Sequence, residues 1–111
     1  MIMLENPFSG KIIQLAFEDF KNKMDWNQAK QFCTQMGEGW RLPDKEEMQL
    51  IFSEMLLKDK GKFKHDRYWS ATEIDMDNAL VFLFYPETTH YYGDYPKEFL
   101  YWVRAVRDMN K

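Results

Sequence analysis

The stretch Gly39–Pro43, with the sequence GWRLP, decides how the rest of the chain is arranged. Its glycine frees the backbone and its proline fixes φ, so the segment is a shaped connector and not part of a helix. The proline also holds the preceding residue extended, so Trp40 and Leu42 point to one side of the chain and Arg41 points to the other. Because two large apolar side chains share one side, we expect the connector to be fixed in a buried core and to serve the structure.

Helical patterns precede and follow this connector. Asp25 is a suitable N-cap for a first helix, and Gly37 is a natural C′ residue after it. Asp44 and Glu47 form the pattern of a capping box, which predicts that a second helix begins there and ends near Leu57. Each helix carries apolar residues at helical spacing. They are Trp26, Ala29, Phe32, Cys33 and Met36 in the first, and Met48, Ile51, Phe52 and Met55 in the second.

Strand patterns account for much of the remaining chain. The predicted strands are residues 11–17, 68–74, 79–85, 90–95 and 99–107. Charged loops are predicted at 18–24 and 58–67, the second of them a solvated basic loop. One strand, two helices and then a series of antiparallel strands predict an α+β fold.

Composition limits the classes of function. A chain of 111 residues makes one domain, here 1–111, and 17% aromatic residues supply a ring-rich core. The net charge of −3 argues against nucleic acid as a partner. No apolar stretch approaches the ~20 residues of a membrane span, and no basic segment leads into an apolar run near Met1, so we expect no membrane partner and no secretory signal. Cys33 stands alone, which excludes an internal disulfide and suits a reducing compartment, so we expect a cytoplasmic protein.

Three motifs occur in order after a predicted helix that carries Trp26, Ala29 and Cys33. They are GWRLP at 39–43, YWSATE at 68–73 and VRAVR at 103–107. In these motifs the chain resembles a bacterial family named after the C-terminal domain of a collagen-like surface protein, the Lcl C-terminal domain family. The resemblance spans about residues 11–108. Members of that family often carry the motifs WRLP, YWSSTE and VRCVR.

The resemblance implies a C-type lectin-like fold, in which two helices flank a mainly antiparallel sheet and the N- and C-terminal strands pair. In this chain that pairing joins residues 11–17 to residues 99–107. Related lectin-like domains bind glycans, proteins or host surfaces. A more distant relative, the formylglycine-generating enzyme domain, is larger and uses a pair of cysteines, so its activity does not carry over to this chain.

One departure from the family pattern concerns a disulfide. The family usually has a cysteine at the position of Ala105, and in the lectin-like fold that cysteine bridges to the position of Cys33. We therefore expect Cys33 to be a buried free thiol packed close to Ala105. Closing a loop of this length contributes about 4 kcal/mol in the chain-entropy model, so this chain must depend on ring-rich packing instead.

Metal and cofactor sites are not predicted. The calcium motifs of sugar-binding lectins are absent from the sequence. Asp75, Asp77 and Asn78 could supply oxygen ligands to a metal, but a hairpin turn uses the same residues. His65 and His90 are too far apart in the sequence for a zinc-ligand motif. We expect no metal and no cofactor.

Catalytic patterns are also lacking, and the candidate anion-binding groups have a structural alternative. Cys33 lies on the apolar face of its predicted helix, which favours a core thiol over a nucleophile. Ser70 and His90 could join an acid in a triad, but no nucleophile elbow surrounds Ser70. Arg104 and Arg107 could face an anionic ligand or pair with acids of the helices, and structural pairing is favoured. We expect a protein that is not an enzyme.

The segment 90–95, with the sequence HYYGDY, is the candidate binding surface. Tyrosine rings give large, rigid contact area, and they hydrogen-bond at their rims and stack on sugars. Alternate burial along a β-ribbon is the simpler explanation, in which every second ring is exposed. The candidate ligand-binding residues are Tyr85, His90, Tyr91, Tyr92, Asp94 and Tyr95, with Tyr101 nearby. We expect a non-catalytic module that binds a protein or a glycan here. The alternative is an assembly subunit that self-associates as a homo-oligomer through the same surface.

Overall fold

The computed structural model describes residues 1–88 and 91–109. The chain begins with strands β1 (Ile2–Glu5) and β2 (Ile12–Leu15) and continues with helices α1 (Trp26–Gln35) and α2 (Lys45–Ile51). A π-helical turn, η1 (Phe52–Leu56), extends α2. The later strands are β3 (Arg67–Glu73), β4 (Asn78–Leu83), β5 (Tyr92–Pro96) and β6 (Val106–Asp108). The predicted α+β order is confirmed.

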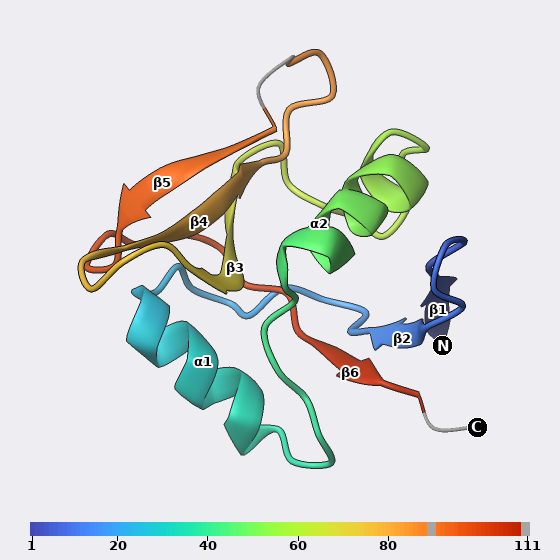
Figure 1. Cartoon of the computed structure of the whole chain (residues 1–111), viewed down its shortest axis with the longest axis horizontal. Helices are drawn as coiled ribbons and strands as arrows, with labels where there is room; N and C mark the ends of the chain where they lie inside the picture. Colours follow the sequence, from blue (N-terminus) through green and yellow to red (C-terminus); the bar gives the residue numbers. More distant parts are fainter. Residues whose placement is uncertain (89–90, 110–111) are drawn as a thin grey trace.

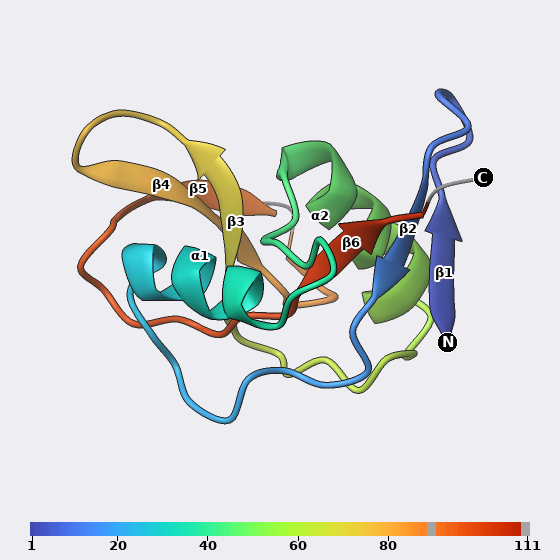
Figure 2. The same cartoon turned by 90° about the horizontal axis from the view of Figure 1, so that it is seen from below.

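Within the described residues the strands form two antiparallel sheets, with the orders β1-β2-β6 and β3-β4-β5. The sheets lie at opposite ends of the molecule with α2 between them, and α1 lies beside the β3-β4-β5 sheet (Figure 1; Figure 2). The one main sheet expected from the resemblance is therefore divided in two. The division follows from the path of the chain after β5, which leaves one sheet and reaches the other only at β6.

β2 pairs with β6, and the register places Leu15 opposite Val106. The expected pairing of the N- and C-terminal predicted strands is thus found at this end of the molecule. The predicted strand 99–107 is regular only at its end. Tyr101 forms a single bridge to Met24, two residues before α1, and Trp102 forms a single bridge to β3. This segment cannot form a continuous ladder because it crosses between the two sheets.

β1 is a strand that the sequence analysis does not predict. It pairs with β2 through a turn in which the Asn6 side-chain oxygen accepts hydrogen bonds from the N–H groups of Phe8 and Ser9. A strand of four residues is too short to show an alternating pattern, so only its pairing with β2 reveals it.

Both helices begin as predicted. The carboxylates of Asp25 and Asp44 accept from the backbone N–H three residues later, and the side chains of Gln28 and Glu47 accept from the N–H groups of the two cap residues. Gly37 follows α1 with a φ of 78°. A side chain is disfavoured at that φ, which explains why glycine ends the helix there.

Strand β4 is buried on both faces. Leu80 and Phe82 belong to a cluster with α2 and η1, whereas Ala79 and Val81 belong to a cluster with α1. The alternation of side chains along a strand sends neighbouring residues to opposite faces. β4 therefore joins the two halves of the core.

The predicted apolar stripe of α1 is correct at three positions and wrong at two. Trp26, Ala29 and Cys33 are buried against the sheet, but Phe32 and Met36 are 43% and 42% exposed. The helix lies at one side of the molecule beside the β3-β4-β5 sheet (Figure 1), and its buried residues belong to the cluster that includes Trp69 of β3. The exposed pair lies at the margin of the buried face.

Cys33 has no exposed surface, and Ala105 is 1% exposed. The expectation of a buried free thiol is confirmed, and both residues belong to the same buried cluster. Burial raises the pKa of the Cys33 thiol to about 12. A thiol that is both covered and protonated at neutral pH is a packing group and not a nucleophile.

The connector occupies the position that its sequence predicts. Leu42 is buried and Trp40 is half-buried, while Arg41 on the other side donates to both carboxylate oxygens of Glu47 at 2.7 Å and to Asp108 at 2.8 Å. Burial alone would raise the pKa of Glu47, but hydrogen bonds from Arg41 and from the N-cap N–H of α2 outweigh it and hold that pKa below its ordinary value. The connector thus ties α2 to β6.

Candidate functional site

The candidate tyrosine segment forms the outer strand of its sheet. Within the described residues, β5 pairs with β4 on one side and its other edge is open (Figure 1). Tyr91 and Tyr92 are 45% and 40% exposed. Asp94 is exposed and Tyr95 is half-buried. His90 lies outside the described residues.

The backbone of β5 presents hydrogen-bonding groups to solvent at alternate residues. The N–H of Leu83 donates to the carbonyl of Tyr91, so odd-numbered residues of this segment exchange bonds with β4. In an antiparallel ladder the intervening residues direct their N–H and C=O groups the other way. The main-chain groups of Tyr92 and Asp94 therefore point to the open edge, where another strand could pair with them.

The exposed rings are held in place by contacts beneath them. The ring centroid of Tyr91 lies 4.8 Å from that of Phe52 in η1, and that of Tyr92 lies 5.4 Å from that of Phe82 in β4. The Lys45 ammonium lies 4.5 Å from the centre of the Tyr92 ring. Strict alternation fails at these neighbouring tyrosines because Tyr91 precedes the regular strand. Rings that are already fixed lose little conformational entropy when a ligand binds.

Tyr95 lies on the opposite face of β5 from Tyr92. The centre of its ring is 5.5 Å from that of Tyr101 and 5.5 Å from the guanidinium carbon of Arg67. Tyr101 is buried, and this burial raises its pKa. Tyr101 therefore supports the surface from below and offers no contact area of its own.

The structure separates one predicted residue from this surface and adds two that were missed. Tyr85 lies in the turn after β4, and no ring contact within the described residues links it to β5. Lys45 and Arg67 reach the β5 tyrosines from α2 and β3. No local sequence pattern could identify these two cations, because only the fold brings them to β5.

The acidic turn between β3 and β4 uses its oxygens internally. One carboxylate oxygen of Asp75 accepts from the backbone N–H groups of Asp77 and Asn78 and from the Asn78 amide. The hydrogen bond from the Asp77 N–H is the largest cause of a pKa of Asp75 below its ordinary value. These residues build a hairpin turn. In residues 1–88 and 91–109, no three His, Cys, Asp or Glu side chains are placed to share a metal ion.

Groups considered for catalysis or anion binding are engaged in the structure. The buried Ser70 hydroxyl donates to a β4 carbonyl at 2.8 Å. Arg104 donates to Asp19 at 2.7 Å, with both side chains almost fully buried. Arg107 donates to Glu38 at 2.9 Å. The structural pairing of both arginines is confirmed, although their acidic partners come from loops and not from the helices.

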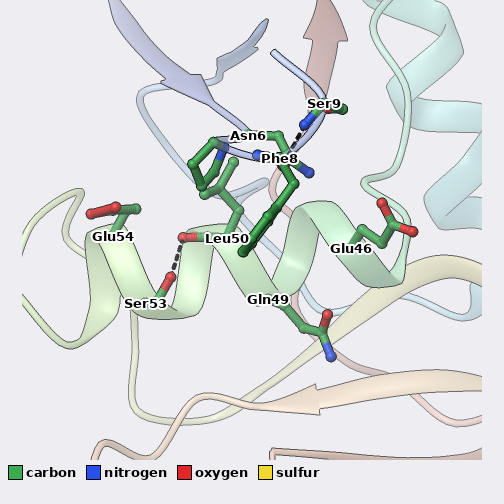
Figure 3. Close-up of a pocket in the computed structure, with 9 residues that line it drawn as sticks. Asn6, Phe8, Ser9, Glu46, Gln49, Leu50, Ser53 and Glu54 are labelled. Carbon is green, nitrogen blue, oxygen red and sulfur yellow. Dashed lines mark hydrogen bonds between the residues drawn. The ribbon is translucent and has the colours of Figure 1, made fainter. Parts of the chain in front are cut away.

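An open groove of about 620 Å³ lies between the β1–β2 turn and the outer face of α2 and η1. Figure 3 shows Phe8 and Leu50 at its middle and Glu46 and Glu54 toward its ends. Phe8 is 98% exposed, and the Ser53 hydroxyl donates to the Leu50 carbonyl. The Ser53 hydroxyl is thus engaged by the helix backbone and is not an activated nucleophile, and the exposed Phe8 gives the groove apolar contact area.

The fold agrees with that of a solved lectin-like protein. The crystal structure of botrocetin matches with a TM-score of 0.55 at 18% sequence identity, over 94% of this chain and 95% of that chain. This likeness shows the fold alone, and it places the chain in the C-type lectin-like fold class. No family model matches the chain, and no curated protein matches it. In the described part of the chain, no helix has the length and apolar character needed to span a bilayer.

Proposed function

We propose that this chain is a non-catalytic binding module that recognises an extended segment of a partner protein along β5. The observation that carries the proposal is the open edge of β5, where the N–H and C=O groups of Tyr92 and Asp94 face away from β4. A partner strand can pair with these groups and extend the β3-β4-β5 sheet, a mode that several peptide-binding domains use.

Tyrosine rings on both faces of β5 add side-chain contact to this pairing. Tyr92 lies on one face and Tyr95 on the other, and Tyr91 lies at the start of the strand. An added strand would place its alternate side chains beside these rings. The same edge therefore supplies affinity through the main chain and selectivity through the rings.

The main-chain groups favour a protein over a glycan. Outward N–H groups recur at every second residue of a strand, about 7 Å apart, and another strand offers carbonyl acceptors at the same interval. A sugar ring could stack on Tyr92, but it would leave most of the edge groups unpaired. The extended peptide is thus the ligand that matches both features.

We also propose a relationship with the Lcl C-terminal domain family on its three motifs. Each motif serves the fold in this chain: Arg41 ties α2 to β6, Trp69 is fully buried, and Arg104 forms a buried ion pair. The motifs therefore support a shared fold and leave ligand choice to the β5 edge.

Substitution of Asp94 tests the proposal at the main chain. Asp94→Pro removes an N–H that faces the open edge and leaves the hydrogen bonds to β4 intact, and proline is tolerated at such positions. Asp94→Ala is the matched control, because it removes the carboxylate and keeps the N–H. Peptides are selected on the wild-type chain from a display library of random decapeptides and then titrated against each variant.

We expect Asp94→Pro to bind the selected peptides at least about tenfold more weakly, because a main-chain hydrogen bond is lost and its acceptor is left unpaired. Asp94→Ala should bind like wild type. Equal binding by all three proteins, each with native circular dichroism, overturns the proposal. Two other results would each support a different function. A mass that rises with concentration and is abolished by Asp94→Pro makes the chain an assembly subunit. Binding on a glycan array, with no peptide selected, makes it a glycan-binding module.

A further inference from the structure

Among the described residues, Arg67 is the arginine that has no acidic partner. The chain has four arginines, at positions 41, 67, 104 and 107. Arg41, Arg104 and Arg107 each donate to a carboxylate at 2.7 to 2.9 Å. Across the described residues, the Arg67 guanidinium forms no hydrogen bond or ion pair, and its Nε atom is buried without a partner. A buried donor in this state is uncommon and costs folding free energy.

The neighbouring carboxylate does not neutralise this guanidinium. One oxygen of Asp66 accepts from the backbone N–H of Arg67 at 2.8 Å, and the other accepts from the Trp102 indole at 3.1 Å. The Lys23 ammonium lies 3.5 Å from that second oxygen. Asp66 is therefore directed toward other groups, and the Arg67 charge remains available.

The tyrosine beside Arg67 is positioned by a glycine. A Cβ on Gly93 would lie 3.2 Å from the Cε1 atom of the Tyr95 ring, so the ring lies over the space that glycine leaves free. The guanidinium carbon of Arg67 is 5.5 Å from the centre of the same ring. The Nε atom of this guanidinium is buried without a partner, and its terminal amino groups are not buried in this way, so they are the groups that a ligand would reach first.

Lys45 is a second cation without an acidic partner at this strand. Its ammonium lies 4.5 Å from the centre of the Tyr92 ring, and it forms no ion pair with any described residue. Tyr92 and Tyr95 face opposite sides of β5. A cation therefore lies on each side of the open edge.

We infer that the recognised segment is acidic, an inference that rests on the proposed pairing along β5. One of its carboxylates would accept hydrogen bonds from the terminal amino groups of Arg67, and another would lie within reach of Lys45. The chain carries a net charge of −3, so its overall field repels an acidic partner. Unpaired cations on both sides of one edge strand reverse that field locally. Arginine binds carboxylates through charge-assisted hydrogen bonds, and partial burial strengthens them.

Three designed decapeptides test the charge preference. In each, valine alternates with one polar residue, which is glutamate, glutamine or lysine. The polar residues of each peptide share one face of the peptide strand. A shift of its pairing register by one residue turns that face to the other side of the sheet, so the polar residues can reach either Arg67 or Lys45. Each peptide is titrated into the ¹⁵N-labelled chain. The amide signals of Tyr92 and Asp94 and the side-chain Nε–H signal of Arg67 are followed by NMR.

We expect the glutamate peptide to bind at least about tenfold more tightly than the glutamine peptide, because a charge-assisted pair replaces a neutral one. The lysine peptide should bind most weakly. The Arg67 Nε–H signal should shift with the glutamate peptide alone. Arg67→Gln should reduce the preference for glutamate, and Lys21→Gln, the same charge change at an exposed loop lysine, should keep it.

The remaining outcomes separate the two proposals. Equal affinity for the glutamate and glutamine peptides, with the Tyr92 and Asp94 amides shifting in both, overturns the acidic preference and leaves the edge pairing standing. No shift of those amides with any peptide overturns both. A shift of the Arg67 Nε–H signal with a glucuronate oligosaccharide, and none with the glutamate peptide, assigns the cations to an acidic glycan and also overturns the inference.

Discussion

Asp19→Asn should be among the most destabilising conservative substitutions in this chain. The carboxylate of Asp19 accepts from Arg104 Nε at 2.7 Å, from the Tyr68 hydroxyl at 2.7 Å and from Lys64 Nζ at 2.8 Å. The Asp19 and Arg104 side chains are only 4% and 3% exposed. One acidic side chain from the loop 18–24 thus satisfies groups from β3, from the basic loop and from the segment before β6.

The magnitude follows from the charge that the substitution leaves behind. Asparagine has nearly the same shape as aspartate, so packing is preserved, but Arg104 becomes a buried cation without a counter-charge. Removing one partner of a buried ion pair costs about 3–5 kcal/mol. A domain of this size has a free energy of unfolding of about 5–15 kcal/mol, so the loss is about a fifth or more of the total.

Urea unfolding followed by tryptophan fluorescence measures this loss. Glu18→Gln is the matched control, since it makes the same chemical change at an exposed neighbour and should alter stability by less than about 0.5 kcal/mol. The double variant Asp19→Leu/Arg104→Met should lose less than Asp19→Asn, because no charge then remains buried. A loss below about 1 kcal/mol for Asp19→Asn would show that water screens the pair, and the reasoning would be refuted.

Two further predictions concern titratable groups. The pKa of Glu47 lies below its ordinary value of 4.5, so its stabilising effect should be present above that pH and should be lost as the pH falls through the lowered folded-state value. This part of the acid dependence should be missing in Glu47→Gln, as measured by urea unfolding from about pH 3 to pH 7, and an unchanged slope would contradict it. The Cys33 thiol, with its pKa raised to about 12, should react with a thiol reagent at least about a hundredfold more slowly in the native chain than in urea. Rapid native labelling would place the thiol at the surface.

The helices could be predicted from the sequence because the forces that start and stop them are local. Asp25 and Asp44 cap helices with partners three residues away, and Gly37 ends one through its own φ. β1 and the interrupted strand 99–107 depend instead on partners far along the chain. The exposure of Phe32 could not be predicted either. Helical spacing predicts which face of α1 carries Phe32, but it does not predict how far the core extends over that face.

The sequence predicts the tyrosine rings of the candidate site but not the cations beside them. Tyr91, Tyr92 and Tyr95 stand out in the composition of one short segment, and that density suggested a surface. The neighbouring sequence does not reveal the roles of these two arginines, because Asp66 directly precedes Arg67 whereas Arg104 lies between Val103 and Ala105. Their roles differ because Asp19 pairs with Arg104, whereas no acid among the described residues pairs with the Arg67 guanidinium.

Cys33 forms no disulfide, and two buried tryptophans provide other links between the first helix and the sheet. The Trp26 indole N–H donates to the Ser70 carbonyl at 2.9 Å, and the Trp69 indole N–H donates to the Met24 carbonyl at 2.8 Å. Both bonds join the start of α1 to β3, and so they hold the first helix on the sheet. A disulfide acts mainly on the unfolded chain, whereas these bonds act in the folded state and do not respond to reductants. The β3-β4-β5 sheet, and with it the proposed β5 edge, is therefore held against α1 by contacts that are independent of redox conditions.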